Sequence, residues 1–222
     1  MTNDFLVGVL KPKVKLICWS SNNEGLDPRR VILLAIKTSA GGVLRKGADY
    51  YLKDYPEEKL SEWIIKAVNF PSVLEHIYFT FLIEGISRVT SHQLVRHRIA
   101  SYTQESQRYS AAERTYIVPK TMVKYGFESR FRELIDKLYR LYDEMIKSGI
   151  PYEDARYVLP QAVTTKILMT VNLRELIHIA CLRLSPHAQW EIRELVKLMI
   201  SEVSKIIPEI HDLVKEGCKR GV

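Results

Sequence analysis

The stretch His76–Ile86 constrains the fold more than any other part of the sequence. Aromatic and β-branched residues dominate it, and such residues favour a half-buried β-strand. Thr164–Val171 has the same character and predicts a second strand. Two shorter apolar runs, Phe5–Leu10 and Val14–Trp19, are further strand candidates. The chain is therefore expected to build a small β-sheet.

Helical periodicity dominates the rest of the sequence. In Phe127–Ser148 apolar residues recur at spacings of three and four, which gives one apolar face of an amphipathic helix. Asp27 followed by Pro28 is a helix-start signal, and Gly41 with Gly42 is a stop signal. On such signals we expect helices over residues 28–39, 56–68, 87–98, 127–148, 151–159, 173–184 and 187–207, with a polar connection over residues 41–55.

Helices thus outnumber strands, and no repeat or composition shift marks a domain boundary. A chain of 222 residues is long enough to bury a substantial core. The sequence predicts an α+β fold: one single domain spanning residues 1–222, in which long helices pack on a modest antiparallel or mixed sheet.

Charge and cysteine usage limit the partners and the location. The net charge of +7 favours anionic partners. No apolar run is long enough to cross a bilayer, and the N-terminus lacks a signal-peptide pattern, so we expect no membrane partner. Cys18, Cys181 and Cys218 are far apart and show no metal-ligand spacing. They are interpreted as free thiols in a reducing compartment, which indicates a cytoplasmic protein.

A polar stretch, Gln93–Ser110, lies between the two best strand candidates. It carries Arg96, His97, Arg98 and Arg108 among hydroxyl and amide side chains, with few apolar residues. Unpaired polar groups are costly to bury, so this stretch is not expected in the core. Guanidinium groups bind phosphate and carboxylate through two parallel hydrogen bonds. The stretch predicts a binding segment for an anionic ligand, with a nucleotide as first candidate; the alternative is a solvated loop.

No glycine-rich phosphate loop is present, so side chains must hold such a nucleotide. The histidines show no zinc-ligand spacing, and we expect no metal site. A second polar cluster spans residues 172–191, where Arg174 and His178 share one helix face and Arg183 points to roughly the opposite side. For Arg174 the alternative is a surface ion pair, and for His178 a half-buried histidine.

At these residues the sequence resembles the flavin-dependent thymidylate synthases. Arg96-His97-Arg98 followed after seven residues by Ser106 matches that family's RHR-x7-S signature. The resemblance runs from about Ser72 to Glu191. Other matching pieces stand in the family's order: Ser72, Glu75-His76, Gln93, Arg108-Tyr109, Arg156, Leu159-Pro160, Asn172, Arg174, Leu182-Arg183 and His187-Ala188-Gln189-Trp190-Glu191.

The resemblance implies the thymidylate synthase-complementing type of fold and a homotetramer with active sites between subunits. It implies a methyltransferase that forms dTMP from dUMP, with FAD, 5,10-methylenetetrahydrofolate and NADPH. The residues that it places at FAD are Ser72, Glu75, Arg96, His97, Arg98, Gln104, Asn172, Leu173, Arg174 and His178. Those that it places at dUMP are Gln93, Leu94, Val95, Arg96, Gln104, Glu105, Ser106, Gln107, Arg108, Arg156 and Arg183.

Arg183 matches the activating residue of that family, and its chemistry follows from the residue type. Carbon 5 of uracil must become nucleophilic to accept a one-carbon unit. No cysteine lies in the binding stretch, and Cys181 sits inside an expected helix without a flanking base. A guanidinium at Arg183 instead favours the N3 anion of uracil, because an opposite charge lowers a pKa. Ser106 has no base beside it, so we expect it to donate or accept hydrogen bonds.

The sequence departs from the family at a few positions. Phe70 stands where His is usual, Thr103-Gln104 where Asn-Glu is usual, and His178 where Asn is usual. Gln104 can still hydrogen-bond but cannot act as an acid. Flavin contacts in the first 70 residues, with Thr38 as a candidate, are not fixed by the match.

A nucleic-acid-binding module is the rival interpretation. The positive charge, with Tyr102 and Tyr109 among the arginines, suits a groove that tracks phosphates. Lys and Arg are, however, spread along the whole chain among 26 acidic residues, and no nucleic-acid-binding motif is present. We therefore expect an enzyme with no nucleic-acid partner.

Overall fold

The computed structural model describes residues 11–21 and 25–221, and in it the chain forms two compact units of discontinuous segments. The described parts of three ranges make up unit 1: Met1–Lys13, Ile83–Val95 and Thr103–Ile167. Unit 2 comprises the described parts of Val14–Leu82, Arg96–Tyr102 and Leu168–Val222. The single-domain organisation stays a prediction.

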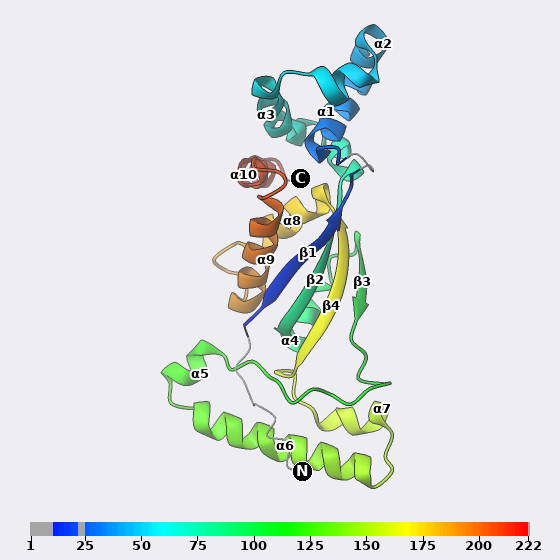
Figure 1. Cartoon of the computed structure of the whole chain (residues 1–222). Helices are drawn as coiled ribbons and strands as arrows, with labels where there is room; N and C mark the ends of the chain where they lie inside the picture. The colour runs from blue at the N-terminus through cyan, green and yellow to red at the C-terminus, as the bar shows by residue number, and fades with distance from the viewer. Residues whose placement is uncertain (1–10, 22–24, 222) are drawn as a thin grey trace. The chain divides into compact units, whose positions relative to one another are not determined.

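A four-stranded antiparallel sheet has the strand order β1-β2-β4-β3 (Figure 1). Along β2 the buried Phe79, Phe81 and Ile83 alternate with more exposed residues, as the two-residue period of a strand requires. The α+β prediction and three of the four strand predictions are confirmed, and Phe5–Leu10 lies outside the described residues. The strands are β1 (Lys13–Trp19), β2 (Tyr78–Ser87), β3 (Ala100–Gln104) and β4 (Thr164–Asn172).

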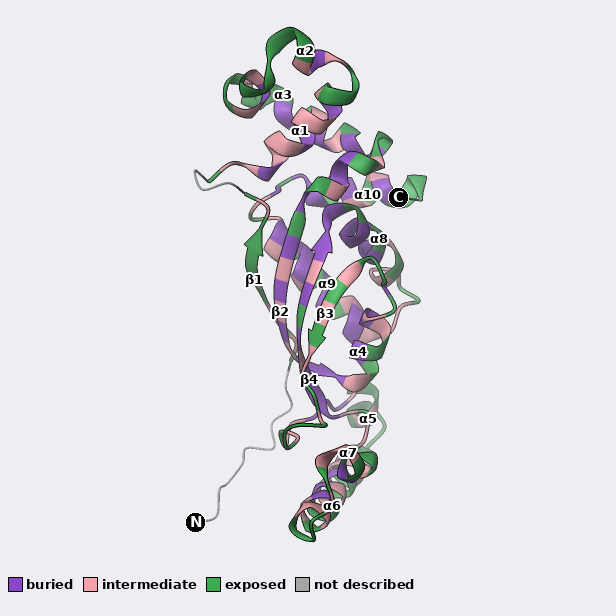
Figure 2. Ribbon diagram, turned by 90° about the vertical axis from the view of Figure 1, so that its right-hand side faces the viewer, coloured by how far each residue is buried: buried purple, intermediate pink, exposed green. Residues whose placement is uncertain are grey.

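Side-chain caps begin the main helices of unit 2. Asp27 accepts a hydrogen bond from the Arg29 backbone N–H at 2.9 Å, and Asn172 accepts one from the Glu175 N–H at 2.8 Å. The later helices cover one face of this unit's strands, and their buried faces form its core (Figure 2). The helices are α1 (Pro28–Ser39), α2 (Gly42–Lys46), α3 (Glu57–Lys66), α8 (Leu173–Arg183), α9 (Trp190–Val203) and α10 (Ile210–Arg220), with 3-10 turns at Ala67–Asn69 and Pro71–His76.

The expected polar connection over residues 41–55 is wrong. It holds α2 and a π-helical turn at Tyr50–Asp54. Gly41 takes a positive φ of 67°, so the chain can reverse after α1 and start a new helix at once. Tyr51 is 5% exposed and packs edge-on against Tyr50, which anchors the segment. Helix α10 was not predicted either.

Unit 1 has a buried hydrophobic cluster of its own. Tyr116, Val118, Ile135, Tyr139 and Val163 form a buried cluster against α6. The predicted amphipathic helix over residues 127–148 is confirmed, whereas the helix over 87–98 ends early. The elements are α4 (Arg88–Leu94), α5 (Lys120–Lys124), α6 (Glu128–Lys147), α7 (Tyr152–Ala155) and a 3-10 turn at Arg156–Val158.

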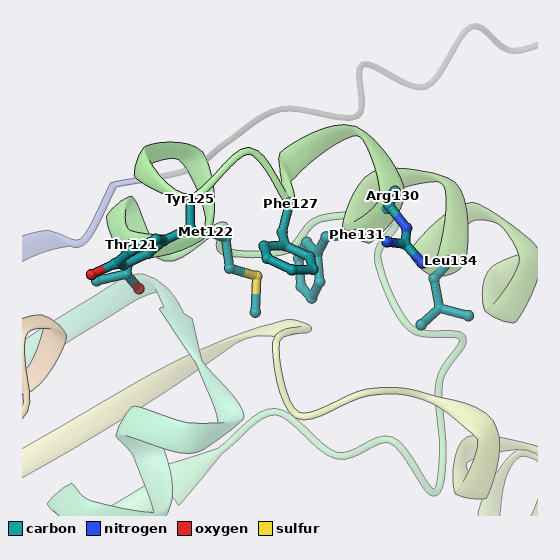
Figure 3. A pocket seen from close by; sticks show the side chains of 7 residues that line it. All are labelled: Thr121, Met122, Tyr125, Phe127, Arg130, Phe131 and Leu134. Atoms are coloured by element: carbon teal, nitrogen blue, oxygen red, sulfur yellow. The ribbon is translucent and has the colours of Figure 1, made fainter.

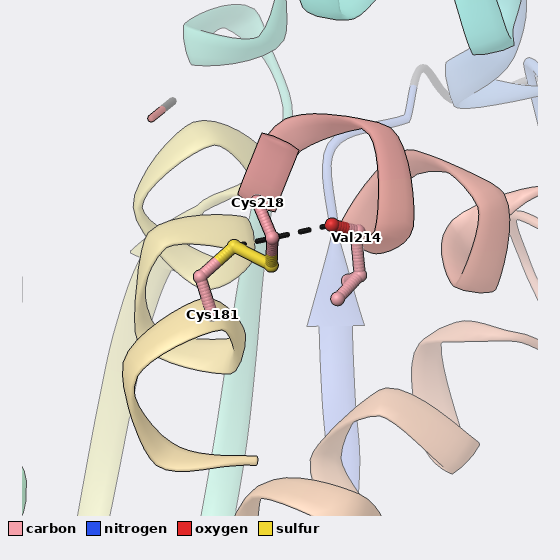
Figure 4. The surroundings of a disulfide bond; sticks show 3 residues. All are labelled: Cys181, Val214 and Cys218. Carbon is pink, nitrogen blue, oxygen red and sulfur yellow. Dashed lines mark hydrogen bonds between the residues drawn. A yellow bond between two sulfur atoms is a disulfide. The ribbon is translucent and has the colours of Figure 1, made fainter. Parts of the chain in front are cut away.

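The prediction of three free thiols is wrong. Cys181 of α8 and Cys218 of α10 form a disulfide, with their Cα atoms 5.2 Å apart (Figure 4). The two helices lie side by side, so residues 37 positions apart in the sequence meet. Cys18 is a free, exposed cysteine. The argument from free thiols to a reducing compartment therefore loses its basis. Among the described residues, no helix has the length and apolarity needed to cross a membrane.

Candidate functional site

A pocket of about 330 Å³ in unit 2 gathers several residues that the sequence places at FAD. Glu75, Asn172, Arg174 and His178 line it. Arg174 Nη1 lies 2.6 Å from Glu75 Oε1, and both side chains are a little under half exposed. Ile99, Glu175 and Gly221 complete the lining. The pocket thus combines an arginine, hydrogen-bonding groups and an apolar wall.

The Arg-His-Arg signature does not continue α4, because that helix ends at Leu94. Its three side chains alternate in exposure. His97 is 5% exposed, whereas Arg96 and Arg98 are exposed to solvent. This arrangement presents both guanidinium groups to solvent, where a ligand can reach them, and directs the imidazole inward.

Buried His97 contacts Arg183 at the end of α8. Arg183 Nε donates a hydrogen bond to His97 Nε2 at 3.0 Å. His97 Nδ1 lies 3.6 Å from Oε1 of buried Glu175, and the Tyr102 hydroxyl donates to the His97 carbonyl at 2.9 Å. Burial, and secondarily the charges of Arg183 and His178, lowers the pKa of His97 to about 4. His97 is therefore neutral near pH 7 and can accept the hydrogen bond.

A second pocket, of about 310 Å³, lies in unit 1 and is rich in basic and amide groups. Arg88, His92, Gln107 and Arg156 are among its lining residues. Arg88 Nη2 donates to the Glu105 carbonyl at 3.2 Å, but the buried Arg88 Nε has no hydrogen-bond partner among the described groups. Burial lowers the pKa of Arg88, and nearby Arg156 adds to this, while Glu105 opposes it. An anion here would satisfy the unpaired donor.

The residues around Ser106 form a local turn. The Ser106 hydroxyl accepts a hydrogen bond from the Arg108 backbone N–H at 3.1 Å, and Arg108 Nε lies 2.5 Å from Glu153 Oε2. The Gln104 amide donates to the hydroxyls of Ser91 and Thr165 at 3.1 and 3.2 Å. Gln104 is thus tied to its own unit by hydrogen bonds, as an uncharged amide allows.

Other residues expected at the site are more dispersed. Leu94 and Leu173 are fully buried, backbone included, so neither residue presents a group to a ligand here. Gln93 and Val95 are half-buried at the end of α4. Ser72 and Glu75 belong to the same 3-10 turn but line different cavities, and Ser72 lines a groove of about 570 Å³. Thr38, Phe70 and His76 are among the other residues that line this groove.

Two residues with a clear place in these clusters were missed by sequence reasoning, Arg88 and Glu175, while Tyr102 was considered only in the rival nucleic-acid interpretation. Arg88 directly follows the strand β2, and a lone arginine at a strand end carries no distinctive pattern. Glu175 lies inside the second polar cluster, beside Arg174. A carboxylate on a helix whose neighbouring residues are mostly apolar is a signal that could have indicated this buried residue.

A groove of about 620 Å³ at the junction of α5 and α6 contains none of the expected site residues. Figure 3 shows Met122, Phe127 and Phe131 close together there, with Leu134 farther along the same helix. Its lining is mainly apolar, and it offers no cluster of basic side chains for a nucleotide.

A family model described as thymidylate synthase complementing protein matches residues 23–209. The chain belongs to this family. Relatives named flavin-dependent thymidylate synthase confirm the resemblance seen in the sequence. One, from Sulfolobus acidocaldarius, is 42% identical over 93% of this chain and 78% of its own length. Another, from Geobacter sulfurreducens, is 40% identical over 88% of this chain and 85% of its own.

A solved structure shares the fold of this thymidylate synthase-complementing chain. It is the UMP/dUMP methylase PolB from Streptomyces cacaoi bound with 5-Br dUMP, with a TM-score of 0.80. The likeness covers 93% of this chain and 95% of that one. At 22% sequence identity it bears on the fold alone.

Proposed function

We propose that the chain is a flavin-dependent thymidylate synthase that converts dUMP to dTMP. FAD is the flavin, 5,10-methylenetetrahydrofolate gives the one-carbon unit, and NADPH is the reductant. The observation that carries the proposal is 40–43% identity to relatives of that name over about nine-tenths of the chain. The positions of the arginines support it.

The pocket at the start of α8 has the chemistry that FAD requires. Arg174 in the pocket, with the exposed Arg96 and Arg98 of the signature, suits the negative pyrophosphate. Asn172 and His178 offer hydrogen-bonding groups, and the exposed Ile99 offers an apolar surface for a ring. Bound FAD supplies hydride transfer, which protein side chains cannot perform.

The basic pocket of unit 1 suits the phosphate of dUMP. Arg88 and Arg156 line it, and the buried Arg88 Nε has an unused N–H. Gln107 lies in the same pocket, and Arg108 stands next to it in the sequence. Phosphate accepts several charge-assisted hydrogen bonds at once, so a pair of arginines is a suitable binding set. Gln93, Glu105 and Ser106 remain proposed contacts for the rest of the nucleotide.

Arg183 activates the uracil ring in this proposal. Its guanidinium favours loss of the N3 proton, because the resulting anion lies beside a fixed positive charge. Negative charge spread from N3 reaches carbon 5, which then attacks the one-carbon unit. The alternative route needs a cysteine thiolate at carbon 6. Cys181, the cysteine nearest in the sequence to a matched motif, forms a disulfide with Cys218 and has no thiolate to offer.

A homotetramer with active sites between subunits is part of the same proposal. Thr80 and Thr170 are hydrogen-bonded through their side chains, which places them on one face of the sheet. By the two-residue period, Tyr78 and Leu168 lie on that face, and they are 48% and 42% exposed. These exposed apolar groups support burial against another copy of the chain. Sedimentation of the purified protein tests the subunit number.

The activity is tested by product analysis. Purified protein should be yellow, with the absorbance of oxidised flavin, and should form dTMP from dUMP when FAD, NADPH and 5,10-methylenetetrahydrofolate are all present. Leaving out NADPH or 5,10-methylenetetrahydrofolate, or stripping the bound flavin from the protein, should stop turnover. A colourless protein that forms no dTMP with all three present contradicts the proposal.

A further inference from the structure

We propose that His97 is a positioning residue that, together with Glu175, holds the Arg183 guanidinium in the orientation needed to activate uracil. This inference rests on the proposed function of Arg183. His97 belongs to the Arg-His-Arg signature, but its ring is buried while both flanking arginines are exposed. Its side chain therefore serves the interior of the site, where it meets Arg183.

The hydrogen bond from Arg183 defines the protonation state of the imidazole. An arginine N–H can only donate, so His97 Nε2 must carry a lone pair. The ring proton of the neutral imidazole then sits on Nδ1. That nitrogen lies 3.6 Å from Glu175 Oε1, and a carboxylate there favours this tautomer. The three groups form an ordered series that runs from Glu175 through His97 to Arg183.

The surroundings keep His97 in this neutral form. The titratable and charged groups around it are Arg183 at Nε2, Glu175 near Nδ1, His178 with ring centroids 6.2 Å apart, and Tyr102 at the His97 carbonyl. Burial and the positive charge of Arg183 oppose the imidazolium and lower the pKa of His97. A protonated ring would lose the acceptor and place two positive charges together.

Fixing Nε restricts the whole guanidinium. The group is planar, so a bond to Nε limits rotation of the plane about the end of the side chain. Arg183 is the last residue of α8, so its side chain extends from the end of the helix. A pre-oriented charge stabilises a developing anion better than a mobile one. His97 therefore acts on the reaction through Arg183.

The test measures the N3 pKa of bound dUMP. The dUMP is labelled with ¹⁵N at N3, and the pKa is read from the pH dependence of its nitrogen NMR signal. It uses FAD-loaded wild type, His97→Leu, His97→Gln and the control His211→Gln on the exposed side of α10. Leucine removes the acceptor, whereas the glutamine amide oxygen can replace it. We expect wild type and His211→Gln to share a lowered pKa. His97→Leu should raise it by about one to two units and lower kcat by roughly 10- to 100-fold, the value of one hydrogen bond to a charged group.

Partial recovery in His97→Gln, with flavin affinity within about threefold of wild type in all variants, is the expected pattern. The positioning role is overturned if bound dUMP has the same N3 pKa in wild type and in His97→Leu. It is also overturned if kcat falls only in proportion to the flavin that the variant loses. If wild type itself neither lowers the N3 pKa nor forms dTMP, the proposed function fails instead. Should His97→Leu not fold, Glu175→Leu takes its place: a smaller rise in the N3 pKa is expected, and no rise refutes the series.

Discussion

Removing the Cys181–Cys218 disulfide should destabilise the chain without disabling its chemistry. The bond closes a loop of 37 residues between α8 and α10. In the chain-entropy model, cross-linking a loop of this length lowers the entropy of the unfolded state enough to stabilise the fold by about 4 kcal/mol at 25 °C. For a chain of this size that corresponds to roughly 8–16 °C in Tm. Cys218 is exposed, so reductant can reach the bond.

The measurement is guanidinium chloride unfolding followed by circular dichroism. The samples are wild type, Cys181→Ser/Cys218→Ser, and Cys18→Ser as the control, each with and without reductant. We expect the double variant to lose about 4 kcal/mol in the free energy of unfolding. Reduced wild type should match the double variant, and Cys18→Ser should match oxidised wild type, because Cys18 is a free cysteine.

Turnover of the double variant well below its unfolding midpoint should stay near that of wild type, because neither sulfur takes part in the proposed reaction. Two results would refute this reasoning. One is a free energy of unfolding unchanged within about 1 kcal/mol, which would mean that the loop is not closed in the folded protein. The other is an equal loss in the free energy of unfolding in Cys18→Ser, which would show that the stabilisation does not come specifically from the Cys181–Cys218 bond.

Three further predictions concern charge. Arg174→Gln should weaken FAD binding by roughly 10- to 100-fold but change stability little, since its ion pair with Glu75 is exposed; fluorescence titration and unfolding measure the two effects, with Arg140→Gln as the control. Arg156→Gln should raise the KM for dUMP by a similar factor and leave FAD affinity unchanged, and an unchanged KM would remove it from the phosphate site. Stability should fall as pH drops from 6.5 to about 4, since the unfolded chain protonates His97 before the folded one does. The difference in the free energy of unfolding between wild type and His97→Gln should therefore change across that window and stay constant above it.

The sequence predicted the elements whose own residues decide their conformation. β2 and β4 carry aromatic and β-branched residues in the two-residue period, and α6 carries a continuous apolar stripe. β3 was missed because Ala100–Gln104 is a polar edge strand, which pairs through its backbone with little contribution from apolar side chains. The Arg-His-Arg signature was expected on a helix, but α4 ends before it. The sequence has no typical capping residue at the end of α4, so this boundary could not be predicted.

Pairing between distant residues was beyond the sequence. Cys181 and Cys218 have no diagnostic spacing, and the helix that carries Cys218 was itself not predicted. The hydrogen bond between His97 and Arg183 joins residues 86 positions apart. Sequence reasoning chose both residues through the family resemblance but assigned them to different ligands. Only the fold shows that the two side chains are hydrogen-bonded to each other.

The central claim is that an arginine, and not a cysteine, activates the uracil ring. Tritium release from dUMP labelled at carbon 5 tests it most directly, in Arg183→Ala and in a variant with all three cysteines replaced by Ala, both loaded with FAD and supplied with NADPH and methylenetetrahydrofolate. The cysteine-free protein should release tritium near the wild-type rate below its unfolding temperature, while Arg183→Ala, with FAD largely retained, should release none. Full release by Arg183→Ala, or loss of release in a folded, flavin-loaded cysteine-free protein, would contradict the account.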